Sequence, residues 1–140
     1  MEVERTLGLI KPDAYAKGVV GRILARAEEA GLTIVALKTV HWTRDEAAGF
    51  YAVHKERPFF GSLVEYMTSG PVVAVLFEGP DAIKKWRDLM GPTDATKAPT
   101  GTLRGDYGTS IEANATHGSD ASETAAFEIG YLFSGFEQVK

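Results

Sequence analysis

Three stretches of the chain are apolar at nearly every position and predict buried β-strands. They cover residues 6–10, 32–40 and 71–77. Short, continuous apolar runs of this kind are typical of strands that are covered on both faces. Pro12 follows the first run and has no backbone N–H to donate to a neighbouring strand. We therefore expect the first strand to end before Pro12, with Lys11 at its carboxyl end.

Four further stretches carry apolar residues at helical spacing. They begin near Val20, Thr43, Pro58 and Pro80, and they run to Gly31, Tyr51, Gly70 and Gly91. Thr43 and Glu46 have the spacing of a capping box, in which each side chain accepts a hydrogen bond from the other residue's backbone N–H. Proline is favoured at the first position of a helix and glycine directly after the last turn. We therefore expect four helices between and after the three strands.

A fifth helix is predicted from residue 121 to residue 133. Asp120 and Glu123 have capping-box spacing, so Asp120 is expected to be the N-cap residue. Glu128 falls on the same helix face as three apolar residues, Ala121, Ala125 and Leu132. That face should pack inward, and His117 should lie just ahead of the helix N-terminus, where anions bind well.

His117 and Glu128 form a candidate pair for nucleophilic catalysis. A carboxylate can accept a hydrogen bond from one imidazole nitrogen and leave the other nitrogen free to act as a nucleophile. The spacing alone leaves two simpler interpretations open. His117 could be a helix cap or a packed surface residue, and Glu128 could be the partner of an arginine.

Residues 92–111 are rich in Gly, Thr, Pro and Asp and show little periodicity. Irregular segments of this length are uncommon in compact domains and are usually functional. This one contains Thr93, Lys97, Thr102 and Arg104. At the other side of the last helix, residues 134–140 predict a short polar tail.

Composition narrows the class of protein. The length of 140 residues predicts a single domain, residues 1–140. The absence of cysteine excludes a disulfide framework, a thiolate metal site and a cysteine nucleophile. The charged first residues and the short apolar run after them fit neither a signal peptide nor a membrane span, so we expect a cytoplasmic protein without a membrane partner. A net charge of −4 argues against general nucleic-acid binding, but it allows a small anionic ligand where basic residues converge.

Four basic residues fall at the ends of predicted elements or in the irregular segment: Lys11, Arg57, Arg87 and Arg104. The planar guanidinium suits phosphate, and a charge-assisted hydrogen bond contributes about 1.5–3 kcal/mol. Several such residues could together hold a polyphosphate. The chain has neither the G-x-x-x-x-G-K-[ST] motif nor G-x-G-x-x-G, so a phosphate site here would be neither a P-loop nor a Rossmann turn. It also lacks H-E-x-x-H and paired-carboxylate metal spacing.

Several short motifs occur together along the chain. They are Ile10-Lys11-Pro12-Asp13, Tyr51 to His54, Arg57-Pro58-Phe59-Phe60, Ser69-Gly70-Pro71-Val72, Gly101 to Tyr107, and Asn114 to Asp120. With these motifs in this order along nearly its whole length, the chain resembles the nucleoside diphosphate kinase family. The run Asn-x-x-His-Gly-Ser-Asp is the most specific of these motifs. Ala95, Ala121 and Leu132 depart from the residues frequent in the family (Pro, Ser and Trp), and none of them touches the chemistry that the resemblance implies.

The resemblance implies an α+β, ferredoxin-like fold: a four-stranded antiparallel sheet covered by helices, with a long irregular segment before His117. The hydrophobic pattern shows three of these strands clearly, whereas the fourth, near residues 115–117, is weak. Family members form homo-oligomers, commonly tetramers or hexamers built from dimers. The strand at residues 32–40 is apolar on both faces, more than the edge strand of a small monomer tolerates, so a partner subunit is its simplest cover.

The resemblance also implies an activity. The enzyme would transfer the terminal phosphoryl group of a nucleoside triphosphate to a nucleoside diphosphate by a ping-pong mechanism, with His117 as the phosphorylated nucleophile, oriented by Glu128. The other matched residues would take these roles: Ser119 supporting Glu128, Tyr51 near Lys11, Lys11 and Asn114 on sugar and phosphates, Arg87, Thr93 and Arg104 on phosphates, and Phe59 stacked on the base. Mg²⁺ would be held mainly by the nucleotide phosphates, without a dedicated set of protein ligands.

Two other functions are compatible with parts of this pattern. A non-catalytic nucleotide-binding or interaction module on the same fold would have lost the nucleophile or the phosphate-binding residues, and all of these are present. A histidine-based phosphatase would need an acid near His117 to activate water. Asp120 is the nearest candidate, although its position fits a helix cap better.

Overall fold

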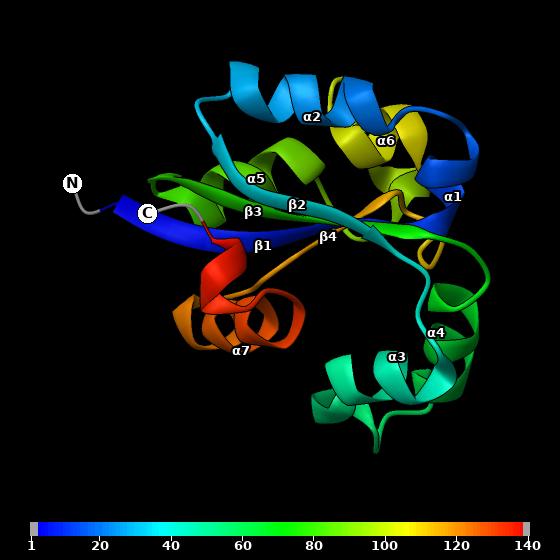
Figure 1. Ribbon diagram of the computed structural model, residues 1–140. Helices are drawn as coiled ribbons and strands as arrows, with labels where there is room; N and C mark the ends of the chain where they lie inside the picture. The colour runs from blue at the N-terminus through cyan, green and yellow to red at the C-terminus, as the bar shows by residue number, and fades with distance from the viewer. Residues whose placement is uncertain (1–2, 139–140) are drawn as a thin grey trace.

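Four antiparallel strands form the centre of the fold in the computed structural model, which describes residues 3–138 (Figure 1). The strands are β1 (Val3–Ile10), β2 (Thr33–Val40), β3 (Val72–Pro80) and β4 (Thr116–Gly118), in the spatial order β2-β3-β1-β4. This arrangement confirms the α+β class with a four-stranded antiparallel sheet. The three apolar runs of the sequence become β1, β2 and β3, and the weak fourth strand is the three-residue β4.

Helices connect the strands and cover both faces of the sheet (Figure 1). The α-helices are α1 (Pro12–Ala16), α2 (Val20–Glu29), α3 (Arg44–Phe50), α4 (Phe60–Met67), α5 (Ala82–Met90), α6 (Leu103–Tyr107) and α7 (Ser122–Leu132). Short 3-10 turns are η1 (Ala52–His54), η2 (Ala95–Lys97) and η3 (Gly135–Glu137). Helices α2, α5 and α6 lie on one side of the sheet and α7 lies on the other, while α3 and α4 form a hairpin beyond the end of the sheet.

The alternation of side chains along β3 explains why its sequence is apolar at almost every position. Val73, Val75 and Phe77 point into a core shared with α2 and α5, whereas Ala74 and Leu76 point into a core shared with α3, α4 and α7. Successive side chains of a strand point to opposite faces, so a strand buried on both faces needs apolar residues throughout. β3 and its neighbour β1 pair over eight residues each and form this doubly covered centre.

β2 does not meet the expectation of burial on both faces within one chain. It lies at the edge of the sheet, with its register shifted between Ile34 and Ala36, and its residues are exposed or partly buried except for Val35, which is buried. Leu37 is 49% exposed. The apolar sequence of this strand is therefore only partly explained by packing within the single chain.

Two of the predicted helix starts were wrong by a few residues. Pro80 is the last residue of β3, paired with Val3, and α5 begins at Ala82 after Asp81, whose φ of 53° turns the chain. Pro58 lies in a turn, and α4 begins at Phe60. Proline is compatible with a strand end as well as with a helix start, so its position alone did not distinguish the two.

Other local predictions can be compared directly with the structure. The Thr43–Glu46 capping box is confirmed, with both reciprocal hydrogen bonds present at 2.8 and 3.2 Å. The first strand ends at Ile10 as expected, but the five-residue helix α1 behind Lys11 was not predicted. The segment at 92–111 contains the turn η2 and the short helix α6. Of the predicted polar tail, residues 139–140 lie outside the described part of the chain, as do residues 1–2 of the predicted domain.

Among residues 3–138, no helix is long and apolar enough to cross a bilayer.

Candidate active site

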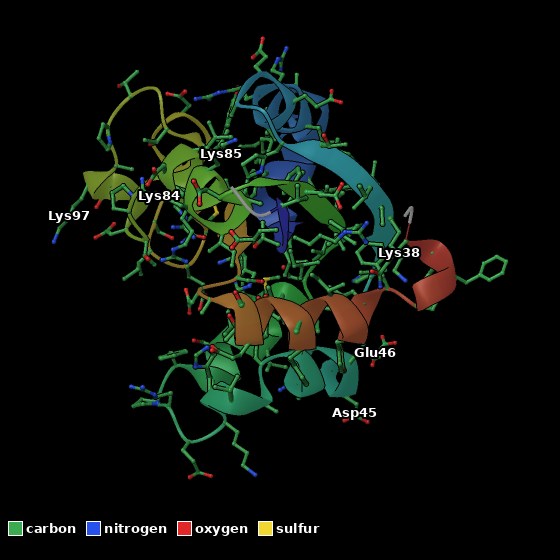
Figure 2. All side chains as sticks on the ribbon, turned by 90° about the vertical axis from the view of Figure 1, so that its left-hand side faces the viewer. Lys38, Asp45, Glu46, Lys84, Lys85 and Lys97 are labelled. Carbon is green, nitrogen blue, oxygen red and sulfur yellow. The ribbon has the colours of Figure 1, made fainter. Side chains whose placement is uncertain are left out.

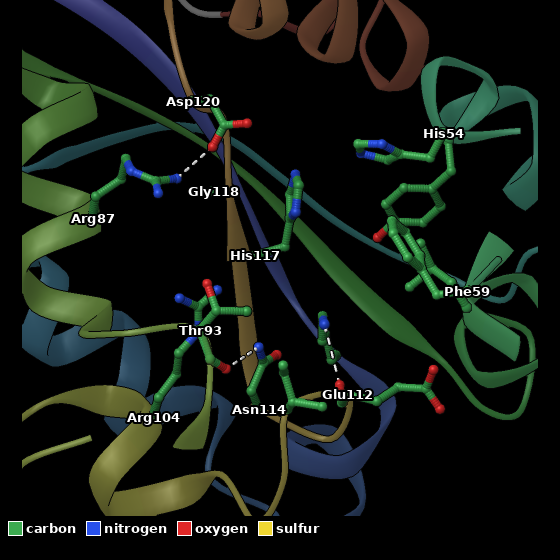
Figure 3. A pocket seen from close by; sticks show the side chains of 14 residues that line it. His54, Phe59, Arg87, Thr93, Arg104, Glu112, Asn114, His117, Gly118 and Asp120 are labelled. Carbon is green, nitrogen blue, oxygen red and sulfur yellow. Dashed lines mark hydrogen bonds and ion pairs between the residues drawn. The ribbon is translucent and has the colours of Figure 1, made fainter. Parts of the chain in front are cut away.

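A cavity of about 470 Å³ lies between the α3–α4 hairpin, the irregular segment and the end of the sheet where β1 and β4 meet (Figure 3). It brings together eight of the residues singled out in the sequence: Lys11, Tyr51, Phe59, Arg87, Thr93, Arg104, Asn114 and His117. Two more, Ser119 and Glu128, lie behind His117 and are hydrogen-bonded to each other. Residues from distant parts of the chain therefore converge on one site.

His117 is held by a carboxylate on the helix that follows it. Its Nε2 lies 3.1 Å from Oε1 of Glu128, and Oγ of Ser119 donates a hydrogen bond to the same oxygen at 2.7 Å. A carboxylate accepts hydrogen bonds, so in the neutral ring this contact favours the tautomer with the proton on Nε2, which leaves the lone pair on Nδ1. This arrangement removes the alternatives in which Glu128 pairs with an arginine or His117 is merely a surface residue.

The backbone around His117 is fixed by the sheet and by α5. His117 pairs with Leu9 of β1, and its carbonyl accepts a hydrogen bond from Nε1 of Trp86 at 3.0 Å. On α7, Glu128 shares its face with the buried residues Ala125 and Leu132, as the helical spacing predicted. The side chains of His117 and Glu128 are 23% and 13% exposed, so the pair is shielded while one face of the ring reaches the cavity.

The prediction that Asp120 caps the last helix was wrong. The N-cap residue is Ala121, and Oγ1 of Thr124 accepts hydrogen bonds from the backbone N–H groups of Asp120 and Ala121. The hydroxyl of Thr124 thus accepts from the backbone N–H of Asp120, which the predicted capping box had assigned to the carboxylate of Glu123. The Asp120 carboxylate instead forms an ion pair with Nη1 of Arg87 at 2.7 Å (Figure 3).

Two of the cations in the cavity are buried, and their charge is costly without an anion. Lys11 donates from Nζ to the carbonyl of Glu112 at 3.2 Å, and burial together with the nearby Arg104 lowers the pKa of Lys11 to about 8. Burial and the nearby Arg87 lower the pKa of Arg104 to about 10. Like charges in a cavity repel one another, and a bound polyanion would relieve that repulsion.

Arg104 is oriented by the backbone and not by an acid. Its Nη1 donates to the carbonyl of Gly91 at 2.9 Å and its Nη2 to the carbonyl of Thr116 at 3.0 Å, while its buried Nε has no hydrogen-bond partner among the described residues. A guanidinium that is held by neutral carbonyls keeps its full charge for a ligand.

Two buried polar groups at the cavity also lack partners among the described residues. Nδ2 of Asn114 donates to the carbonyl of Thr93 at 2.8 Å, which leaves the buried Oδ1 free to accept. The buried hydroxyl of Tyr51 is likewise unpaired, and burial, with a smaller effect of Glu128, raises the pKa of Tyr51 so that it stays protonated. Unpaired buried polar groups are rare in proteins, and at a cavity they are available to a ligand.

Part of the cavity lining is apolar. Phe59, the residue before α4, is 46% exposed, and Leu63 and Ile111 line the same cavity. Ile111 is 64% exposed despite being a large aliphatic residue. An exposed aromatic ring beside aliphatic side chains is suited to a planar, partly apolar ligand group.

The structure also adds lining residues to which the sequence analysis gave no ligand-binding role. These are His54, Leu63, Ile111, Glu112, Gly118 and Asp120. Ile111 ends the irregular segment and Glu112 follows it directly, and no periodicity there indicates which side chains face inward. Conversely, Arg57, Lys97 and Thr102 do not line the cavity, and Lys97 points away from the molecule (Figure 2).

Within residues 3–138, no group of three or more His, Cys, Asp or Glu side chains is placed to hold a metal ion.

Comparisons with known proteins identify the family of this chain. A family model described as nucleoside diphosphate kinase matches residues 4–138. The chain belongs to the nucleoside diphosphate kinase family. The nucleoside diphosphate kinase of Desulfovibrio desulfuricans is 59% identical over 135 residues, which are 96% of this chain and 97% of that protein.

Solved structures of nucleoside diphosphate kinases share the fold closely. The Aquifex aeolicus enzyme superimposes with a TM-score of 0.96 at 50% identity, covering 99% of this chain and 100% of that one. The Halobacterium salinarum enzyme, solved in complex with CDP, superimposes with a TM-score of 0.94 at 42% identity, covering 99% of this chain and 93% of that one. The resemblance inferred from the motifs and the phosphotransferase class are thereby confirmed.

Because the pKa of Lys11 is lowered, we predict that the affinity for ADP depends on pH. If the charged lysine binds phosphate, the affinity for ADP should fall about tenfold between pH 7 and pH 9, because Lys11 loses its proton near pH 8. Isothermal titration calorimetry without added metal measures this directly. Lys11→Met should bind ADP more weakly at pH 7 and change less than about twofold over the same range.

Lys97→Met is the matched control, because Lys97 is exposed and lies outside the cavity. It should show the wild-type pH dependence. A wild-type affinity that is constant from pH 7 to pH 9 would show that Lys11 does not hold the ligand.

Proposed function

We propose that residues 1–140 form one nucleoside diphosphate kinase domain, which transfers the terminal phosphoryl group of a nucleoside triphosphate to a nucleoside diphosphate through a phosphohistidine on Nδ1 of His117. The observation that carries this proposal is the position of His117. Its Nε2 is held by Glu128, and the ring reaches a cavity that is also lined by Lys11, Arg87 and Arg104.

The first half-reaction follows from this geometry. The lone pair of Nδ1 attacks the terminal phosphorus, a new N–P bond forms, and the bond to the bridging oxygen breaks, so that the nucleoside diphosphate leaves with that oxygen. The ring becomes positively charged, and Glu128 stabilises this charge through the proton on Nε2. A second nucleoside diphosphate then takes the phosphoryl group by the reverse path, which makes the kinetics ping-pong.

The remaining residues position the nucleotide and neutralise its charge. Phosphoryl transfer depends mainly on positioning and on electrostatic stabilisation, and the three cations supply both. Thr93 adds a hydroxyl on the phosphate side, while Oδ1 of Asn114 is a free acceptor suited to a sugar hydroxyl. Phe59 offers a π-face to the base, and stacking of this kind contributes about 1–3 kcal/mol without selecting one base.

Tyr51 offers a further polar group to the bound nucleotide. Its ring lies edge-on to that of His117, with 6.1 Å between the ring centroids, and it lines the cavity together with Lys11. Its protonated hydroxyl is a donor available to a phosphate oxygen. Ser119 acts indirectly, because its hydroxyl donates a hydrogen bond to the Glu128 carboxylate, which orients His117.

Mg²⁺ is the proposed cofactor. The cavity is lined by three cations and by the separate carboxylates of Asp120 and Glu112, a donor set that binds phosphate rather than a metal ion. The metal would therefore be held mainly by phosphate oxygens, where it neutralises charge on the transferring group. We further propose that the enzyme acts in the cytoplasm, where a nucleotide substrate is available.

The alternatives are less well supported. A non-catalytic module does not account for the partly buried His117–Glu128 pair beside two buried cations. A phosphatase needs an acid that activates water, and Asp120 is instead ion-paired with Arg87.

The covalent intermediate can be tested by labelling. Incubation with γ-labelled ATP should place label on the protein that is stable to alkali and lost in acid, as expected for a phosphohistidine. His117→Ala should abolish it, and His54→Ala, which removes another histidine of the same cavity, should retain it. Label retained by His117→Ala would place the nucleophile elsewhere, and release of inorganic phosphate without transfer to ADP would favour the phosphatase.

Glu128→Gln should impair transfer without abolishing it. The amide oxygen can still accept from Nε2 of His117, but the negative charge that stabilises the imidazolium is lost. Replacing a charge-assisted hydrogen bond by a neutral one should lower kcat about 5- to 30-fold. Steady-state kinetics on the folded variant measures this, and an unchanged kcat would show that Glu128 has only a structural role.

We also propose that the chain forms a homo-oligomer, a tetramer or hexamer built from dimers. Its edge strand β2 exposes backbone hydrogen-bonding groups and the apolar Leu37, which a second copy of the strand could cover. Leu37→Lys should weaken assembly in light scattering, whereas Val53→Lys, at an exposed apolar position away from β2, should not. A wild-type monomer at micromolar concentration would contradict the proposal.

A further inference from the structure

Asp13 connects three segments that are far apart in the sequence. Its Oδ2 accepts a hydrogen bond from the backbone N–H of Ala115 at 3.0 Å, and its Oδ1 accepts one from the hydroxyl of Tyr66 on α4. The Tyr66 hydroxyl in turn accepts from the backbone N–H of Asp13 at 3.2 Å. Both carboxylate oxygens are therefore occupied by protein groups, and Asp13 does not line the cavity.

Ala115 has an unusual backbone conformation. Its φ is 72°, and the N–H of Thr116 donates across it to the carbonyl of Asn114 at 2.9 Å. A hydrogen bond between residues i+2 and i with a positive φ between them is the rare and strained form of the γ-turn. Among non-glycine residues 3–138, only Asp81 also has a positive φ, and Ala115, unlike Asp81, is fully buried.

The strained turn is held from both sides by the segment that follows β1. The N–H of Ala115 is bound by the carboxylate of Asp13, and its carbonyl accepts from the backbone N–H of Lys11 at 2.8 Å. Pro12 lies between these two residues at the first position of α1 and fixes their separation. A strained conformation persists only where its surroundings over-determine it, and here Lys11 and Asp13 do so.

The position of this turn relates it to catalysis. Asn114 precedes it, and β4 with His117 begins directly after it. The turn therefore sets the direction in which the chain enters β4 and the direction of the Asn114 side chain, whose amide is fixed on Thr93. A small change at Ala115 would move the nucleophile and the neighbouring acceptor together.

We infer that Asp13 is a positioning residue for phosphoryl transfer, which acts by holding the strained γ-turn at Ala115 and thereby aligning His117 with the bound nucleotide. The inference rests on the proposed function of His117. Through Tyr66, Asp13 also ties this turn to α4, the helix that follows Phe59, so the two walls of the cavity are anchored on one carboxylate.

The test uses a second-site substitution. Asp13→Ala should lower kcat about 30-fold and leave the dissociation constant for ADP within about threefold, because the ligand-binding side chains remain. Glycine adopts positive φ without the penalty that alanine has. Ala115→Gly in the Asp13→Ala background should therefore recover kcat about tenfold, whereas Ala115→Gly alone should stay within about twofold of the wild type.

Two further variants separate positioning from general stability. Tyr66→Phe keeps the bond between Asp13 and Ala115 and should keep kcat within about threefold. Asp45→Ala removes an exposed aspartate in the first turn of another helix and should leave kcat unchanged (Figure 2). If Asp13→Ala does not fold, Asp13→Asn makes the same comparison, with a loss of at least threefold in kcat that Ala115→Gly reverses.

The outcomes that overturn the inference are specific. They are an unchanged kcat in the Asp13 variant, a loss that Ala115→Gly does not reverse, or a loss in Tyr66→Phe as large as that in Asp13→Ala. Absence of turnover and of labelling in the wild-type protein would instead overturn the proposed function itself.

Discussion

The site depends on the close packing of Trp86 against two paired glycines. Gly8 of β1 lies opposite Gly118 of β4, and a β-carbon added to either would meet the Trp86 ring at 3.0 and 2.5 Å. The indole can therefore lie directly on the strands and donate to the carbonyl of His117. This contact fixes α5 against β4, and it places Arg87, the next residue on α5, beside the nucleophile.

Electrostatics in the cavity differ from those of the whole chain. The protein carries a net charge of −4, yet Lys11 and Arg104 are buried near each other at the site. Burial lowers the pKa values of both residues, with a further effect of Arg104 on Lys11 and of Arg87 on Arg104, so charge at this site costs free energy in the absence of a ligand. A nucleotide polyphosphate would compensate this cost, so part of the binding free energy is already stored in the free protein.

Local sequence signals predicted the elements well and their ends less well. Apolar runs located β1 and β3 because both strands are covered on two faces, and the Thr43–Glu46 cap located the start of α3. The helix starts predicted at Pro58 and Pro80 were wrong, because proline is also compatible with strand ends and turns. Asp120 was misplaced because its carboxylate pairs with Arg87, a residue 33 positions earlier in the chain that local spacing does not reveal.

The sequence by itself determined the family, the α+β class and most of the residues at the site, because the motifs occur in order along nearly the whole chain. Helical spacing also placed Glu128 on the face that meets His117. Only the tertiary structure decided that Nε2 is the nitrogen held by Glu128, that Ile111 faces the cavity, and that Asp13 supports a strained turn at Ala115. These features depend on contacts between segments up to about a hundred residues apart, and no local propensity encodes such contacts.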